Sequence, residues 1–375
     1  MLQSFVNHCK YNIDSIDAQM LKIAVLVSGG VDSAVALKLL QDQGHTVTAF
    51  YLKIWLADEL SFLGECPWEE DLSYVRQVCA QLQVPLEIVP FQQAYQDRVV
   101  QYTMAEIKAG RTPNPDIMCN RQVKFGAFLD YLLAEKTGQF DYVASGHYAQ
   151  VTRQAGQSFL MIAPDPVKDQ TYFLAYLTQA QLAKIIFPIG HLAKSQVRAL
   201  AQQFNLPNKD RKDSQGICFL GKLKFPEFVK FHLGEKIGDL IEFETGQKLG
   251  VHRGVWFYTI GQRQGLGLSG GPWYVVAKDL VRNLVYISRT YYAVDKERRH
   301  LTVGQLNWIA GQPPTKTQLR VKLRHGVPYH DCEITGSADQ QLLQVTLAMS
   351  DQGIAPGQFA VFYDGEICLG GGVIV

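Results

Sequence analysis

The first half of the chain alternates between short apolar runs and amphipathic segments. Residues 22–27 form an apolar run typical of a buried strand, and a helical pattern over 33–43 follows and ends at Gly44. The same kind of pattern predicts further strands at 46–52, 86–89 and 142–144, and helices at 71–82 and 123–135. Strands that alternate with helices are joined by crossovers into a parallel sheet. The first half is therefore predicted to be an α/β domain with a doubly wound parallel sheet.

From about residue 237 the pattern changes to glycine-rich turns between short β-type runs. Such runs occur at 273–276, 284–287, 319–323, 342–347 and 359–363. Short strands with a turn about every ten residues are typical of a small antiparallel barrel or sandwich. The pattern predicts three domains, at residues 1–213, 214–298 and 299–375, with a small central domain and a C-terminal antiparallel β-barrel.

Composition agrees with a multidomain globular protein. The chain has 375 residues, of which 47% are apolar and 19% charged, and 375 residues exceed what one ordinary core holds. It has no uncharged apolar run of about 18 residues, so no membrane span is expected. The first twenty residues resemble neither a secretory signal nor a transit peptide, which predicts a cytoplasmic protein.

Positive charge is unevenly distributed, although the formal net charge is only +1. Residues 184–236 hold ten Lys or Arg against four acidic residues, a surplus of six positive charges. A local surplus of this size suits phosphate groups, and it is equally compatible with a solvated basic face. The segment is a candidate surface for nucleic acid.

The string Ser28-Gly29-Gly30-Val31-Asp32-Ser33 lies between a predicted strand and a predicted helix. Two glycines let backbone N–H groups approach an anion, and the helix N-terminus adds its positive dipole end. Asp32 and Ser33 can hold Mg²⁺ or phosphate. The string resembles the PP-loop of enzymes that split ATP between its α and β phosphates. A second glycine string, GLGLSG at 265–270, precedes a strand rather than a helix and is predicted to be a turn.

Two of the seven cysteines have basic neighbours. Cys119 precedes the predicted helix at 123–135 and lies beside Arg121 and Lys124, and Cys218 follows a basic cluster. A helix start and nearby cations lower a thiol pKa, so both cysteines are predicted to favour thiolate. Two ordinary cysteines remain the alternative. With an odd count and no CxxC, the cysteines predict neither a disulfide scaffold nor a metal site.

Several strings together resemble the MnmA/TrmU family of tRNA 2-thiouridylases. They are the PP-loop string, TPNPDIMCNRQVKFG around Cys119, KDSQGICFLG around Cys218, and the segments at 144–149, 168–174, 258–267 and 357–373. They occur in the family's order and extend from about residue 22 to 374. Residues 1–213 would then be the nucleotide-binding and catalytic domain, and residues 214–298 a tRNA-binding domain.

The resemblance implies a set of functional residues. ATP, with Mg²⁺, would be held by Leu26, Val27, Ser28, Gly29, Gly30, Val31, Asp32, Ser33, Leu52 and Gly146. Contacts with tRNA would come from Asn114, Pro115, Asp116, Lys168, Asp169, Gln170, Arg324 and His325. Cys218 would carry a persulfide received from a sulfur-carrier protein, Cys119 would be a nucleophile, and Asp116 an acid or base.

The implied reaction is the ATP-dependent 2-thiolation of the wobble uridine of tRNA. AMP would first be transferred to uracil O2, and sulfur would then replace it, either directly from the persulfide or as hydrosulfide. Two alternatives keep part of the pattern. A PP-loop synthetase acting on a small molecule would not need the two thiols, and a non-catalytic tRNA-binding protein would not need an intact PP-loop.

Overall fold

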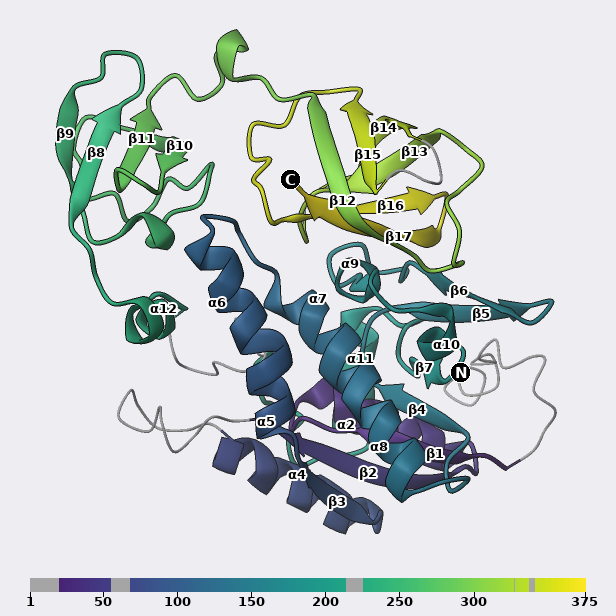
Figure 1. Ribbon diagram of the computed structural model, residues 1–375. Helices are drawn as coiled ribbons and strands as arrows, with labels where there is room; N and C mark the ends of the chain where they lie inside the picture. Colours follow the sequence, from purple (N-terminus) through teal and green to yellow (C-terminus); the bar gives the residue numbers. More distant parts are fainter. Residues whose placement is uncertain (1–19, 55–67, 214–224, 327, 337–340) are drawn as a thin grey trace.

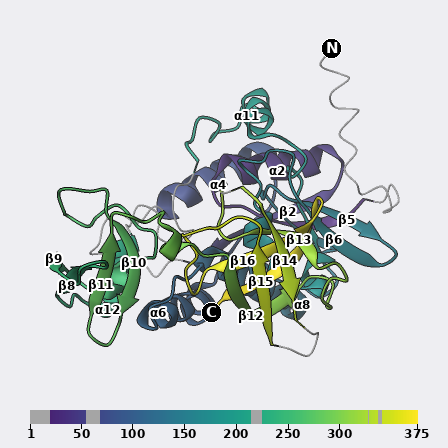
Figure 2. The ribbon, with the colours of Figure 1, turned by 90° about the horizontal axis from the view of Figure 1, so that it is seen from above.

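The computed structural model describes residues 20–54, 68–213, 225–326, 328–336 and 341–375 (Figure 1). These residues form three sheets: a five-stranded sheet in the first half of the chain, a four-stranded sheet in the centre, and an eight-stranded sheet that includes the C-terminus. The four-stranded sheet stands to one side of the other two in both views of the ribbon (Figures 1 and 2). No helix in the described ranges combines the length and the apolar character needed to cross a bilayer.

The five-stranded sheet is parallel, with the strand order β3-β2-β1-β4-β7. Its strands are β1 (Lys22–Leu26), β2 (Thr46–Lys53), β3 (Leu86–Pro90), β4 (Tyr142–Ser145) and β7 (Ile185–Ile186). One face is covered by α2 (Val31–Asp42), α4 (Trp68–Leu82) and α11 (Lys194–Gln203), which share one hydrophobic core. The opposite face has a second core. The prediction of a doubly wound parallel sheet is confirmed.

Two helical stretches built partly from π-helix cover that second face. The first consists of α5 (Gln92–Tyr95), the π-helical η2 (Gln96–Val100) and α6 (Gln101–Lys108), and the second of α7 (Pro115–Cys119), the π-helical η3 (Asn120–Ala127) and α8 (Phe128–Glu135). The predicted start of the second helix at residue 123 is wrong. The helix begins at Pro115, after Asn114, whose side-chain oxygen accepts a hydrogen bond from the Ile117 N–H. Asn is a favoured cap and Pro a favoured first residue, so this local signal was present.

The C-terminal sheet closes into a six-stranded antiparallel barrel, as predicted. Its order is β12-β15-β14-β13-β16-β17, and β12 also pairs with β17. The strands are β12 (His300–Trp308), β13 (Gln318–Lys322), β14 (His330–Thr335), β15 (Leu342–Leu347), β16 (Phe359–Asp364) and β17 (Ile367–Ile374). Closure depends on glycine. A Cβ on Gly370 would lie 2.1 Å from the Asn307 carbonyl oxygen, and one on Gly371 would lie 2.3 Å from that of Ala360.

A hairpin from the first half of the chain extends the barrel sheet to eight strands. It consists of β5 (Gln150–Gln154) and β6 (Gln157–Met161), and β6 pairs with β17 through Leu160 opposite Cys368. Residues of the barrel, including Phe359 and Val361, belong to the same core as the helices on the second face of the parallel sheet. The two regions are therefore packed into one body, with the barrel over the α/β domain (Figure 1).

The central sheet has the order β10-β11-β8-β9 and its own small core. Its strands are β8 (Gly238–Glu242), β9 (Lys248–His252), β10 (Tyr274–Asp279) and β11 (Leu284–Ser288). β8 and β11 pair in parallel, so this sheet is mixed rather than antiparallel. The GLGLSG string lies in turns just before β10, with positive φ at Gly265, Gly267 and Gly270, and the predicted turn is confirmed.

Short helices complete the chain between these units. They are α9 (Thr171–Leu174), α10 (Gln179–Leu182), α12 (Phe225–Leu233), and the 3₁₀ turns η4 (Val255–Phe257) and η5 (Val294–Lys296). One residue of α10, Gln181, donates its side-chain amide to the Arg121 and Phe125 carbonyl oxygens at 2.9 and 2.7 Å. A π-helix leaves some carbonyl oxygens without their usual α-helical partner. In η3 the Gln181 side chain provides the missing hydrogen-bond donor.

Candidate active site

The predicted PP-loop connects β1 to α2 at the carboxyl end of the parallel sheet. Gly29 has φ +76°, a left-handed conformation that glycine adopts without strain. A Cβ at this position would also lie 2.6 Å from the Asp71 carbonyl oxygen. Ser33 fixes the turn, because its hydroxyl accepts a hydrogen bond from the Ser28 N–H at 3.3 Å and donates one to the Gly30 carbonyl at 3.1 Å.

Gly146 lies against this loop from the neighbouring strand β4. A Cβ on Gly146 would lie 2.7 Å from the Ser33 backbone nitrogen, so only glycine allows this approach. Leu52 lies near the end of β2 on the other side of β1. The chain leaves β1 toward β2, and β4 pairs on the opposite side, which makes this edge the topological switch point where open α/β sheets bind ligands. The structure thus gathers the candidate ATP residues at one edge.

Asp32, in the first turn of α2, is the centre of an ion-pair network. Its carboxylate accepts hydrogen bonds from the Tyr148 hydroxyl at 2.9 Å and from the Lys194 ammonium at 2.7 and 2.9 Å. Lys194 also lies 2.8 Å from Asp213, which pairs in turn with Lys168 at 2.8 Å and with Arg198. The network links the PP-loop to residues far away in sequence.

The network changes the ionisation of two of its members. Partial burial by itself would raise the pKa of Asp213, but hydrogen bonds from Lys168, Lys194 and Arg198 outweigh it and hold the pKa well below its ordinary value. Tyr148 has a raised pKa because it is buried and donates to the Asp32 carboxylate. Asp213 is therefore a carboxylate and Tyr148 a neutral donor at any physiological pH.

Sequence reasoning missed Lys194, Tyr148, Asn208 and Asp213 as members of this site. The buried Asn208 side chain donates to the Gly29 carbonyl at 2.8 Å and so holds the PP-loop from outside. In the sequence, Lys194 is only one of the ten cations at residues 184–236. Three cations of that segment, Lys194, Arg198 and Arg211, are paired with Asp32, Asp213 and Asp71 around the PP-loop. These three cations therefore neutralise carboxylates around the PP-loop. Binding of tRNA by the remaining cations of the segment stays a prediction.

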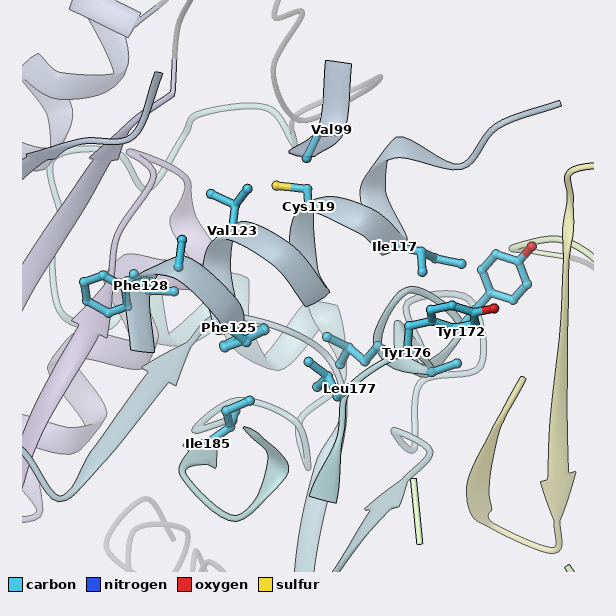
Figure 3. Packing of buried hydrophobic residues seen from close by; sticks show 14 of the residues in the cluster. Val99, Ile117, Cys119, Val123, Phe125, Phe128, Tyr172, Tyr176, Leu177 and Ile185 are labelled. Atoms are coloured by element: carbon cyan, nitrogen blue, oxygen red, sulfur yellow. The ribbon is translucent and has the colours of Figure 1, made fainter. Parts of the chain in front are cut away.

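Cys119 lies in a different environment, at the end of α7 and fully buried. Its sulfur lies among the side chains of Val99 and Val123 in the core on the second face of the sheet (Figure 3). Burial raises the pKa of this thiol to about 11, and the opposing effect of Lys124 is smaller. The prediction of a lowered pKa is wrong for this structure. The helix begins four residues before Cys119, and the apolar core outweighs the neighbouring cations.

The candidate residues near Cys119 differ in exposure. Asn114 caps α7, Pro115 is buried, and Asp116 is half-buried in the first turn. The His325 ring contacts the Phe173 ring in a tilted arrangement with centroids 4.6 Å apart. The pKa of His325 is lowered mainly by burial, and Asp169 and Asp116 oppose that effect. The structure therefore brings the segments around residues 116, 169 and 325 together.

The remaining candidate tRNA residues already have protein partners. Asp169, which is 2% exposed, accepts hydrogen bonds from Thr171 and forms a buried ion pair with Lys322 at 3.3 Å. Gln170 accepts from the Tyr148 N–H at 2.9 Å, and Arg324 pairs with Asp351 at 2.8 Å. In this structure Asp169 supports its loop from beneath instead of facing solvent.

Three family profiles match consecutive parts of the chain. The profile described as tRNA methyl transferase HUP domain matches residues 21–222, the tRNA methyl transferase PRC-barrel domain matches 226–289, and the aminomethyltransferase beta-barrel domain matches 298–374. A curated relative from Parabacteroides distasonis, named tRNA-specific 2-thiouridylase MnmA, is 44% identical over 95% of this chain and 99% of its own length. The chain belongs to the MnmA family of tRNA 2-thiouridylases.

Two further family members are similar over nearly their whole length. The tRNA-specific 2-thiouridylase MnmA 2 of Bacteroides fragilis is 43% identical over 94% of this chain and all of its own. The MnmA protein of Porphyromonas gingivalis is 42% identical over 94% of this chain and 99% of its own. The resemblance inferred from the motifs is confirmed.

The second cysteine expected of an MnmA protein, Cys218, lies outside the described residues, as do Cys9 and Cys66. Cys79 lies on the buried face of α4, and burial raises its pKa to about 11. Such a thiol is inert and fills space in the core. Within the described part of the chain, Cys119 is thus the cysteine that the MnmA motif singles out.

Proposed function

We propose that this protein thiolates C2 of the wobble uridine of tRNA, using ATP to activate the base and a persulfide as the sulfur source. The observation that carries the proposal is the PP-loop, a glycine-containing turn at the switch point of the parallel sheet. It occurs in a chain that matches the MnmA family over nearly its whole length. The reaction would take place in the cytoplasm, where tRNA is available.

The PP-loop fits the polyphosphate of ATP. The glycines at 29 and 146 leave space that a Cβ would fill, and the N-terminus of α2 adds its dipole. Residues 26–33, Leu52 and Gly146 would hold the nucleotide. Asp32 and Ser33 would contribute oxygen ligands to Mg²⁺, which neutralises charge on the phosphates. The chain's own task is to fix the phosphates so that the α phosphate faces the base.

Activation of the base is the first chemical step in this proposal. Uracil O2 attacks the α phosphate, the bond to the β phosphate breaks, and pyrophosphate leaves, so that C2 bears an adenylate as leaving group. Asn114, Pro115 and Asp116 would meet the base, with Asp116 moving a proton as acid or base. The wobble base must leave its stack to reach this site.

Sulfur transfer is the second step. A sulfur-carrier protein would place a persulfide on Cys218. Its terminal sulfur attacks C2 and AMP leaves. In the direct route this leaves Cys218 joined to C2 through a sulfur–sulfur bond. Cys119 then attacks the Cys218 sulfur of that bond, which releases the outer sulfur on C2 as the thiocarbonyl and forms a Cys119–Cys218 disulfide. In the other route Cys119 attacks the persulfide first, and the released hydrosulfide attacks C2. Both routes oxidise the two thiols, so an external thiol must reduce the disulfide before the next turnover.

Each route requires Cys119 in a position different from the one described. A buried thiol with a pKa of about 11 is a poor nucleophile at neutral pH. We therefore include in the proposal that tRNA binding rearranges α7 and exposes Cys119. The π-helical segment that follows supports this, because such turns are less stable than α-helix and occur at functional sites.

Binding of tRNA would use residues of all three predicted domains. Lys168 and Gln170 lie on the loop beneath which Asp169 is buried, and Arg324 and His325 come from the barrel. Residues 1–213 would then supply nucleotide binding and catalysis, and residues 214–298 and 299–375 would position the tRNA.

The proposal is tested by supplying purified protein with tRNA, ATP and a persulfide donor. We expect pyrophosphate release that depends on tRNA, and 2-thiouridine among the digested nucleosides by mass spectrometry. Pyrophosphate release at full rate without tRNA would instead indicate a synthetase acting on a small molecule. Binding of tRNA without pyrophosphate release would indicate a non-catalytic binding protein.

A further inference from the structure

Lys194 is placed at the PP-loop by an element that the motif does not include. It is the first residue of α11, and its backbone N–H donates to the Asp165 carboxylate at 3.0 Å. α11 packs beside α2, so the lysine side chain reaches the first turn of the neighbouring helix. There its ammonium lies within 2.9 Å of both Asp32 oxygens and 2.8 Å from Asp213. The side chain is only 15% exposed.

Asp32 creates an electrostatic problem for an anion site. Its carboxylate lies in the first turn of α2, where the phosphates of a nucleotide would bind, and like charges at such a distance repel. Asp213 places a second negative charge nearby, on the other side of Lys194's ammonium group, which contacts both carboxylates. Three cations, Lys168, Lys194 and Arg198, surround these two carboxylates, and Lys194 is the one that touches both. The site can accept a polyanion because its carboxylates are neutralised in advance.

We propose that Lys194 is a further nucleotide-binding residue, which binds the pyrophosphate portion of ATP when the loop is occupied. An ammonium group on a four-carbon stem can exchange one oxygen partner for another while its helix stays in place. In the free protein its partners are Asp32 and Asp213, and a phosphate oxygen would replace one of them. This inference rests on the proposed use of ATP. It assigns a residue outside the PP-loop to the β and γ phosphates, which are released as pyrophosphate.

The direct test compares affinities for two nucleotides that differ in their phosphates. The probes are α,β-methylene-ATP, which cannot be split between the α and β phosphates, and AMP, with Mg²⁺ present in titration calorimetry. Lys194→Gln should weaken the triphosphate analogue roughly 10- to 100-fold, the loss expected for a charged hydrogen bond. AMP should lose less than about threefold, because it lacks the phosphates that Lys194 would bind. Lys194→Arg, which keeps the charge, should lie between wild type and Lys194→Gln.

Lys38→Gln is the matched control. Lys38 forms an ion pair with Asp42 at the opposite end of α2, so its loss removes a lysine and an ion pair from the same helix. Both nucleotides should bind this variant as they bind the wild type. If Lys194→Gln also binds the triphosphate analogue normally, or loses both nucleotides equally, Lys194 is only a structural partner of Asp32 and the inference is overturned.

A double-mutant cycle separates direct contact from action through Asp32. In an Asp32→Asn background the ion pair with Asp32 is already lost and only that with Asp213 remains, so a role exerted through Asp32 predicts no additional effect of Lys194→Gln. A direct phosphate contact predicts that most of the fold-loss persists. A wild-type protein that binds neither nucleotide would overturn the nucleotide assignment itself. A wild-type protein that binds both, with no effect of Lys194, would overturn this inference alone.

Discussion

The PP-loop lies at the carboxyl edge of the parallel sheet and Cys119 in the core on the sheet's second face, and the two are prepared for reaction to different degrees. The PP-loop has its glycine conformation, its helix N-terminus and a charge-balanced network of Asp32, Lys194 and Asp213 already in place. Cys119 is sealed in an apolar core, and its pKa is raised to about 11. In the proposed reaction the nucleotide half of the site is therefore preorganised, whereas the sulfur half needs a change of structure. A reactive thiol kept buried until substrate binds is protected from oxidation and from premature attack on a persulfide.

The largest expected effect is on the preorganised side. Asp32→Ala removes an acceptor of both Tyr148 and Lys194, which leaves the Tyr148 hydroxyl without this partner and Lys194 with Asp213 alone. We expect pyrophosphate release that depends on tRNA to fall below detection, while circular dichroism reports a folded protein. Turnover at the wild-type rate would contradict the PP-loop assignment.

Two serine variants address the sulfur side. Cys218→Ser has no thiol to carry the persulfide, so it should accept no ³⁵S label from the donor and form no 2-thiouridine. Cys119→Ser should still accept the label, because loading needs only Cys218 and the donor, yet it should fail to complete transfer. Normal transfer by Cys218→Ser would show that the persulfide is carried elsewhere.

The burial of Cys119 can be measured directly by alkylation. Burial raises the pKa of this thiol to about 11, so at neutral pH the thiolate fraction is about a hundredfold lower than for a free thiol. Iodoacetamide followed by peptide mass spectrometry should therefore modify Cys119 at least about a hundredfold more slowly than in urea. Saturating tRNA should accelerate the reaction. Protection unchanged by tRNA would argue against a rearrangement of α7.

The sequence predicted the PP-loop side of this contrast but not the Cys119 side. The apolar run at 22–27, the two glycines and the helical pattern are local signals, and each formed as expected. The pKa of Cys119 was predicted wrongly. The prediction rested on Arg121 and Lys124, which are close in sequence, whereas the burial that raises the pKa comes from residues distant in sequence, such as Val99. The contribution of Lys194 depends on the packing of α11 against α2. Local patterns carry no information about such contacts, and those contacts determine the electrostatics of both halves.

The buried ion pair between Asp169 and Lys322 connects the α/β domain to the barrel and should matter for stability. Lys322 is 4% exposed, so Lys322→Ala leaves a buried carboxylate without its cation. We expect a loss of about 3–5 kcal/mol in the free energy of unfolding by urea. Lys316→Ala, which removes an exposed pair with Asp364 in the same barrel, is the matched control and should change little. Equal effects of the two variants would contradict this account.

The smallest expected effect concerns pH. The pKa of Asp213 is lower in the folded protein than its ordinary value near 3.8, so the folded state binds this proton less readily. Its ion pairs therefore stabilise the protein fully above about pH 4, and this contribution is lost as the pH falls through the folded pKa. Asp213→Asn should lower the free energy of unfolding at pH 6 by on the order of 1 kcal/mol. The difference from wild type should shrink below about pH 4. A difference that grows toward acid would mean that the sign is wrong.

The β5–β6 hairpin sets a condition on how the chain is made. β6 takes its place beside β17, yet β17 leaves the ribosome about 200 residues later, roughly 10 to 40 s at ordinary rates of synthesis. During that interval the edge of β6 would offer unpaired N–H and carbonyl groups to other chains. The last strand of the protein thus covers one of the early ones. Chains that end before residue 367 should lose more than the barrel, because they expose this edge and become prone to aggregation.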